Sequence, residues 1–263
     1  MPPFDAHTPS QSRAETVRDL RRLLAKTNGT STEAAALPFG LPALDTRLPQ
    51  GGLSFGALHE IAPGAATDMP AAFGFATALL GRLAQADRKQ GPVLIVTGPN
   101  DIAENGCPYG HGLSRLGLDP ARVLLVRTKS DKQTLWALEE ALRSTLPAAV
   151  AGVIERLAFR TSQRLQLAAE NSRRPLLVLR PPGIAGSSVA ITRWRIGPAA
   201  AARDRFGLIT RWRWRVTLER CRNGRPGEWL LEFDHAYRFS LAAAVADPAL
   251  HRSASARSFM RAS

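Results

Sequence analysis

The chain has 263 residues, 44% of them apolar, which is enough for one large domain with tails or for one domain plus a small subdomain. No apolar run reaches the roughly 18 residues that cross a bilayer. Residues 1–5 also lack the basic start and apolar core of a secretion signal. We therefore expect a cytoplasmic protein without membrane contact. Its two cysteines, Cys107 and Cys221, indicate neither a disulfide framework nor a metal site.

The formal net charge of +13 comes entirely from the second part of the chain. Residues 1–155 contain 15 basic and 15 acidic side chains, whereas residues 156–263 contain 20 arginines, no lysine and 7 acidic residues. A general compositional bias towards arginine would affect both parts equally. The placement of the charge therefore favours a polyanionic partner, with nucleic acid first.

Residues 14–26 are predicted to form a helix followed by a linker that ends near residue 36. Its apolar stripe consists of Val17, Leu20, Leu23 and Leu24. A short helix of this kind is marginal in isolation and needs a surface on which to bury the stripe. That surface belongs either to the same domain or to a neighbouring molecule.

Residues 57–89 read as a strand over 57–61, a loop of small residues and a helix over 70–89, which is the layout of a phosphate-binding P-loop. A working loop ends in Gly-Lys-Ser/Thr, but here Asp68, Met69 and Pro70 stand at those positions. We expect Asp68 to cap the helix and to repel a phosphate by its charge. No cofactor is expected at this degenerate loop, whose marker residues are Pro63, Gly64, Asp68, Met69 and Pro70.

Short, continuously apolar runs over 93–96, 123–126, 149–154 and 176–179 are typical of strands buried on both faces. Helical patterns lie between them, so we predict parallel strands joined by helical crossovers. From residue 189 the pattern changes to longer alternating strands. These cover 191–196, 209–220, 228–233 and 237–241, and we interpret them as antiparallel.

The sequence thus predicts an α/β protein with a mostly parallel sheet covered by helices, and with antiparallel strands in its C-terminal part. We expect an N-terminal helix and linker over 1–36, one domain over 37–243 and a disordered basic tail over 244–263.

Arginine and tryptophan alternate over residues 211–215. On a strand, the tryptophans would share the core face with Val216 and Leu218, while Arg211, Arg213 and Arg215 would share the opposite face. Arg193 and Arg195 flank Trp194 in the same way. If the two strands are neighbours, the five arginines form one surface that suits a phosphate backbone or an acidic protein.

The segment before the loop resembles the lead-in to the phosphate loop of RecA recombinases. The matching residues are Leu41, Leu44, Asp45, Leu48, Gly51, Gly52, Leu53, Gly56, Glu60 and Ile61. Together with the degenerate loop and the Arg/Trp-rich second half, this lead-in makes residues 37–241 similar to the ImuA family of bacterial mutagenesis accessory proteins. The resemblance implies a RecA-like fold.

The same resemblance implies a non-catalytic role in a DNA-damage-induced translesion synthesis mutasome. The implied partners are an ImuB-like polymerase subunit, an error-prone replicative-type polymerase, RecA and DNA. RecA docks onto the adjacent protomer through an N-terminal helix, so Val17, Leu20, Leu23 and Leu24 are candidates for association with a second copy or with a partner.

Hydrolysis of ATP would need the missing Lys and hydroxyl, and also a carboxylate that orients water where this chain has Gly98 or Pro99. Only an acidic residue closing a later strand, Glu155, remains. The alternatives are a RecA-like DNA-dependent ATPase with an unconventional phosphate site, and a SulA-type inhibitor of cell division. The basic second half speaks against the latter.

Overall fold

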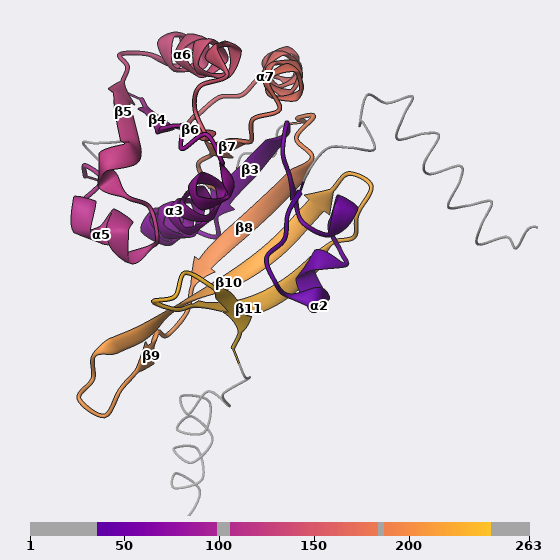
Figure 1. The fold of residues 1–263 in the computed structure, drawn as a ribbon. Helices are drawn as coiled ribbons and strands as arrows, with labels where there is room; N and C mark the ends of the chain where they lie inside the picture. The colour runs from indigo at the N-terminus through magenta and orange to yellow at the C-terminus, as the bar shows by residue number, and fades with distance from the viewer. Residues whose placement is uncertain (1–35, 99–105, 184–186, 243–263) are drawn as a thin grey trace, which may run out of the picture. The chain divides into compact units, whose positions relative to one another are not determined.

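The computed structural model describes residues 36–98, 106–183 and 187–242, which form α/β layers around a ten-stranded sheet (Figure 1). The predicted helix over 14–26 and the predicted tail over 244–263 lie outside these residues and stay predictions.

The parallel part of the sheet contains the apolar runs seen in the sequence. These strands are β3 (Leu58–Pro63), β4 (Val93–Thr97), β5 (Val123–Arg127), β6 (Ala149–Val153) and β7 (Leu176–Leu179). Strands β3, β4, β6 and β7 are buried along almost their whole length because helices cover both faces of the sheet there. The prediction of an α/β fold with a mostly parallel sheet is confirmed.

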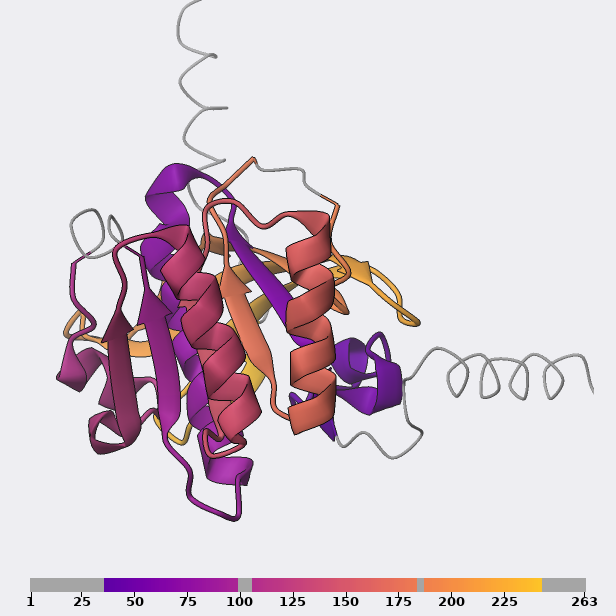
Figure 2. The ribbon, with the colours of Figure 1, turned by 90° about the horizontal axis from the view of Figure 1, so that it is seen from above.

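Helix α3 (Met69–Ala86) covers one face of the sheet, and α6 (Asp131–Ser144) and α7 (Phe159–Ser172) cover the other (Figure 2). Leu79, Leu80 and Leu83 of α3 are buried in the larger apolar core. Leu138 of α6 and Leu165 of α7 are buried in the second apolar core, on the other face of the sheet. The short α5 (Gly110–Arg115) lies between β4 and β5 in the chain.

The C-terminal part of the sheet is formed by β8 (Thr192–Pro198), β9 (Ala202–Arg203), β10 (Ile209–Cys221), β11 (Gly227–Phe233) and β12 (Phe239–Leu241). All neighbours of β10 are antiparallel to it, as predicted. In spatial order the strands of the sheet are β12-β11-β10-β8-β3-β7-β6-β4-β5, and β9 pairs with β10. Strand β8 joins the two parts of the sheet, because it is antiparallel to β10 and parallel to β3. The alternation of buried and more exposed side chains along β8 indicates that only one of its faces is covered. Such alternation occurs in parallel and antiparallel strands alike.

The segment before β3 packs against the α3 side of the sheet. It contains β1 (Ala36–Leu37), α2 (Pro42–Asp45) and β2 (Leu53–Ser54). The carboxylate of Asp45 accepts hydrogen bonds from the backbone N–H groups of Phe39, at 2.7 Å, and Leu41, at 2.8 Å. The lead-in residues therefore fold a local turn that buries Phe39, Leu41 and Leu44.

Among the helices of the described segments, none combines the length and apolar character that a membrane span requires.

Candidate functional site

The degenerate loop connects β3 to α3, as the sequence predicts, and its backbone is held by the protein itself. The N–H of Gly64 donates to the carbonyl of Ile196 on β8 at 2.8 Å. The N–H of Ala65 donates to the Asp68 carboxylate at 3.0 Å. Two loop amides that could face a phosphate therefore have partners within the chain.

Asp68 does not cap α3 with its side chain, which differs from the expectation. Its carboxylate folds back over the loop, so that a Cβ added to Gly64 would lie 3.0 Å from Oδ2. The reason is geometric, since a 3₁₀ turn over Ala66–Asp68 precedes α3 and directs the carboxylate towards Ala65. An acidic side chain thus lies directly against Gly64 and Ala65 of the loop.

The two residues after Asp68 also have structural roles. Met69 is partly buried and packs against the larger apolar core. Pro70 lies in the first turn of α3, a position where its missing N–H has no helical partner to lose. Neither side chain offers a cation or a hydroxyl for a nucleotide.

The acidic residues expected near a nucleotide are not assembled around the loop. Glu155 is exposed in the loop that follows β6. Gly98 follows β4, and Pro99 lies outside the described residues. Over the residues that the structure describes, no group of three or more His, Cys, Asp or Glu side chains is arranged to hold a metal ion.

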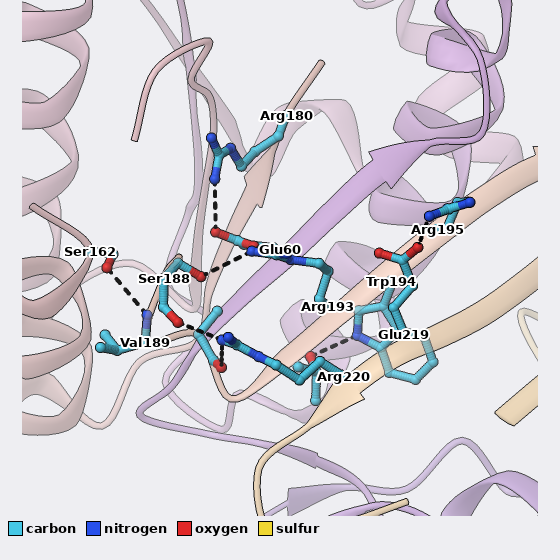
Figure 3. Close-up of polar contacts among 12 residues, drawn as sticks. Glu60, Ser162, Arg180, Ser188, Val189, Arg193, Trp194, Arg195, Glu219 and Arg220 are labelled. Carbon is cyan, nitrogen blue, oxygen red and sulfur yellow. Dashed lines mark hydrogen bonds and ion pairs between the residues drawn. The ribbon is translucent and has the colours of Figure 1, made fainter. Parts of the chain in front are cut away.

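Beside the loop, a buried carboxylate binds one arginine from β8 and one that directly follows β7 (Figure 3). Glu60 of β3 is 1% exposed. Its Oε2 accepts from Nε of Arg193 on β8 at 2.7 Å, and its Oε1 accepts from Nη1 of Arg180 after β7 at 3.3 Å. Arg220 lies close to this cluster, and burial, followed by the charge of Arg193, lowers its pKa.

A cavity of about 450 Å³ opens between this cluster and the degenerate loop. Its polar lining consists of Glu60, Arg180, Arg193, Arg195 and Glu219, and Pro63 and Gly64 of the loop also line it. Arg195 and Glu219 form an ion pair on neighbouring strands. The cavity therefore holds nearly balanced charges, with three cations and two anions.

The arginines of β10 lie on the face opposite the core, as the period of two predicts. Trp214, Val216 and Leu218 are buried on the α3 side, and Trp212 packs partly against the same core. Arg213 pairs with Glu232 of β11, and Arg195 of β8 pairs with Thr217 of β10. Arg193, Arg195, Arg211, Arg213 and Arg215 thus lie on one face, which we call the arginine face.

Most of the arginine face is neutralised by acidic residues that sequence reasoning did not include. The Glu232 side chain is 5% exposed and accepts from Nη1 of Arg211 at 2.9 Å and from Nε of Arg213 at 2.7 Å. Burial alone would raise the pKa of Glu232, but hydrogen bonds from both arginines and their charges outweigh it and lower the pKa. In the described part of the chain, Arg215 makes no ion pair, and it is exposed.

The sequence does contain a pattern that could have identified these acidic residues. Glu219 and Glu232 occupy outward positions of alternating strands, where they share a face with the arginines. Which arginine each one pairs with depends on the strand register.

A buried polar chain supports the same strands from the core side. Trp194 Nε1–H donates to Thr192 Oγ1 at 2.7 Å, and Thr192 lies 2.7 Å from Nδ1 of His59. His59 Nε2 lies 2.9 Å from the Ser54 carbonyl, which can only accept, so we assign the proton to Nε2. Complete burial lowers the pKa of His59 to about 4, despite the opposing backbone hydrogen bond, and keeps the ring neutral.

Comparison with known proteins places this architecture in a family. No protein-family model matches the chain. The protein named ImuA from Caulobacter vibrioides strain NA1000 / CB15N is 37% identical over 239 residues, covering 83% of this chain and 93% of the relative. ImuA from strain ATCC 19089 / CIP 103742 / CB 15 of the same species gives the same identity and coverage. On this similarity along most of both sequences, the chain belongs to the ImuA family.

Proposed function

We propose that the chain is a non-catalytic accessory protein of a DNA-damage-induced translesion synthesis mutasome. Membership of the ImuA family supports a role in mutagenesis together with an ImuB-like polymerase subunit. The main observation that supports a non-catalytic role is the position of the Asp68 carboxylate, which folds over the loop beside Gly64 and Ala65. The phosphates of a nucleoside triphosphate would be repelled by this carboxylate, and the loop has no lysine to offset the repulsion.

The protein acts through binding surfaces. Its partners are the ImuB-like subunit and an error-prone replicative-type polymerase, with RecA and DNA as further partners. The stripe Val17, Leu20, Leu23 and Leu24 associates with a second copy or with a partner, and the arginine face binds DNA or an acidic protein surface.

The availability of charge differs along the arginine face. Arg211 and Arg213 already hold Glu232, and Arg193 holds Glu60. Arg215 is exposed and has no acidic partner in the described residues. Its guanidinium group is therefore the one most available to an external ligand. Reversing its charge should therefore weaken binding without disturbing a buried ion pair.

Calorimetry with MgATP tests the non-catalytic part of the proposal. We expect no binding at micromolar concentrations by the parent chain, and no turnover with or without DNA. A micromolar dissociation constant, or hydrolysis stimulated by DNA, would favour the ATPase alternative.

Genetic complementation tests the cellular role. In cells lacking the gene, we expect the parent chain to restore damage-induced mutation and to co-purify with the ImuB-like subunit. Arg215→Glu should reduce both the mutation frequency and the recovery of DNA or partner. Filamentation of cells on overexpression, without any change in induced mutation, would support a division inhibitor instead.

A further inference from the structure

The hairpin formed by β9 and the start of β10 extends beyond the strands that flank it (Figure 1). Strand β11 pairs with β10 only from Trp212 onwards, and β8 pairs only from Trp214 onwards. Ile209 and Arg211 pair with β9 alone. Residues 199–211, which we call the hairpin arm, therefore project from the sheet, and no other strand of the described segments pairs along either edge.

The tip of the arm is a well-defined turn. Asp204 Oδ1 accepts from the backbone N–H groups of Phe206, at 2.8 Å, and Leu208, at 2.9 Å. Arg203 donates from Nη1 to the carbonyl of Gly207 at 2.6 Å, and Gly207 has a φ of +81°. These contacts use the only acidic side chain of the arm to build the turn. They also fix the backbone before any ligand arrives.

This ordered turn presents two large apolar side chains to solvent. Phe206 is 71% exposed and Leu208 is 66% exposed, whereas the tryptophans farther along β10 pack against the core. The guanidinium carbon of Arg205 lies 4.7 Å from the centroid of the Phe206 ring. One side of the ring thus has a cation beside it, and the large exposed fraction leaves the rest of the ring accessible.

We propose that the tip of the hairpin arm binds single-stranded nucleic acid, with a base stacked on Phe206 and phosphates paired with Arg203 and Arg205. An aromatic ring next to arginines is the combination used for strands whose bases are unpaired. This inference goes beyond the proposed function, which assigns no role to the tip.

The connection from the tip to the arginine face favours nucleic acid over an acidic protein. Strand β10 begins directly after Leu208 and leads to Arg211, Arg213 and Arg215, so that Leu208 and Arg215 are separated by roughly 23 Å at about 3.3 Å per residue. Arg211 and Arg213 hold Glu232, whereas Arg215 has no acidic partner in the described residues. A ligand that follows the strand therefore needs a flat apolar group at the tip and negative charge that reaches Arg215. Single-stranded nucleic acid has both, and stacking requires no particular base.

Fluorescence anisotropy of the full chain with a labelled oligothymidylate and with an abasic strand of the same length tests this assignment. Phe206→Ala should weaken binding to oligothymidylate about tenfold and leave the abasic strand within about twofold, because only stacking is lost. Phe206→Trp should retain binding to oligothymidylate. Trp136→Ala, which removes a 65% exposed aromatic ring from α6, is the matched control and should bind as the parent does.

Circular dichroism should show that every variant folds, since the altered side chains are exposed. The assignment fails if the parent does not bind oligothymidylate. It also fails if Phe206→Ala leaves the affinity for both strands unchanged, or weakens the affinity for both strands equally. If Phe206→Ala/Leu208→Ala loses the ImuB-like subunit but keeps the oligonucleotide, the tip is a protein contact. If this double variant keeps both its co-purification with that subunit and its binding to DNA, the tip assignment is wrong, whereas the proposed function is unaffected.

Discussion

Truncation of Arg213 is the sharpest test of how the arginine face is held. Arg213→Ala removes the less exposed of the two partners of Glu232, since the Arg213 side chain is 19% exposed and that of Arg211 is 55% exposed. A buried charge that loses its partner costs about 3–5 kcal/mol. The remaining, largely solvated Arg211 offsets up to about 1 kcal/mol of this. We therefore expect the free energy of unfolding to fall by about 3 kcal/mol.

Urea unfolding at pH 7 measures this loss, and Arg215→Ala is the matched control on the same strand face. The control should stay within about 0.5 kcal/mol of the parent, because Arg215 is exposed and has no ion pair in the described residues. In a Glu232→Gln background, Arg213→Ala should cost less than about 1 kcal/mol, because no buried charge is left behind.

The pH dependence gives an independent check. The folded-state pKa of Glu232 is depressed, so its ion pairs stabilise the parent above the unfolded pKa, and this contribution is lost as the pH falls through the folded pKa. In Arg213→Ala the folded pKa rises, so the variant protonates Glu232 earlier. The difference between parent and variant should therefore shrink as the pH is lowered from 7 towards 4. A difference independent of pH, or one unaffected by Glu232→Gln, would refute this account.

Two further predictions concern the core. Because the pKa of His59 is lowered from 6.5 to about 4, its neutral form contributes about 3 kcal/mol above pH 6.5 that is lost as the pH falls to 4. Denaturant unfolding should show this loss in the parent, and a His59→Gln variant with an undiminished pH slope would contradict it. Gly81→Ala should destabilise α3 by about 1–3 kcal/mol, because its Cβ would lie 2.6 Å from the Gly117 carbonyl. Gly112→Ala has open space and should be neutral or stabilising in thermal unfolding; equal losses would contradict the packing argument.

Local pattern was sufficient for much of the fold. The apolar runs over 93–96 and 176–179 identified β4 and β7, because strands covered on both faces require apolar side chains at every position. The period of two over 211–218 placed Trp214 in the core and Arg215 outside. The identity of residues 68–70 predicted a loop without a phosphate-binding lysine. These properties depend on neighbours in the chain, which the sequence states directly.

Only the tertiary structure decided which charges meet. Glu60 lies between Arg180 and Arg193, and Glu232 lies beside Arg213, because strands distant in the chain became neighbours in a particular register. The direction of β8 relative to β3 was decided in the same way, since alternation reports a covered face and carries no information about the neighbouring strand. The exposure of Phe206 followed from where β8 and β11 stop pairing with β10. A sequence specifies a side chain's local periodicity, whereas its electrostatic environment and exposure come from segments brought together by the sheet.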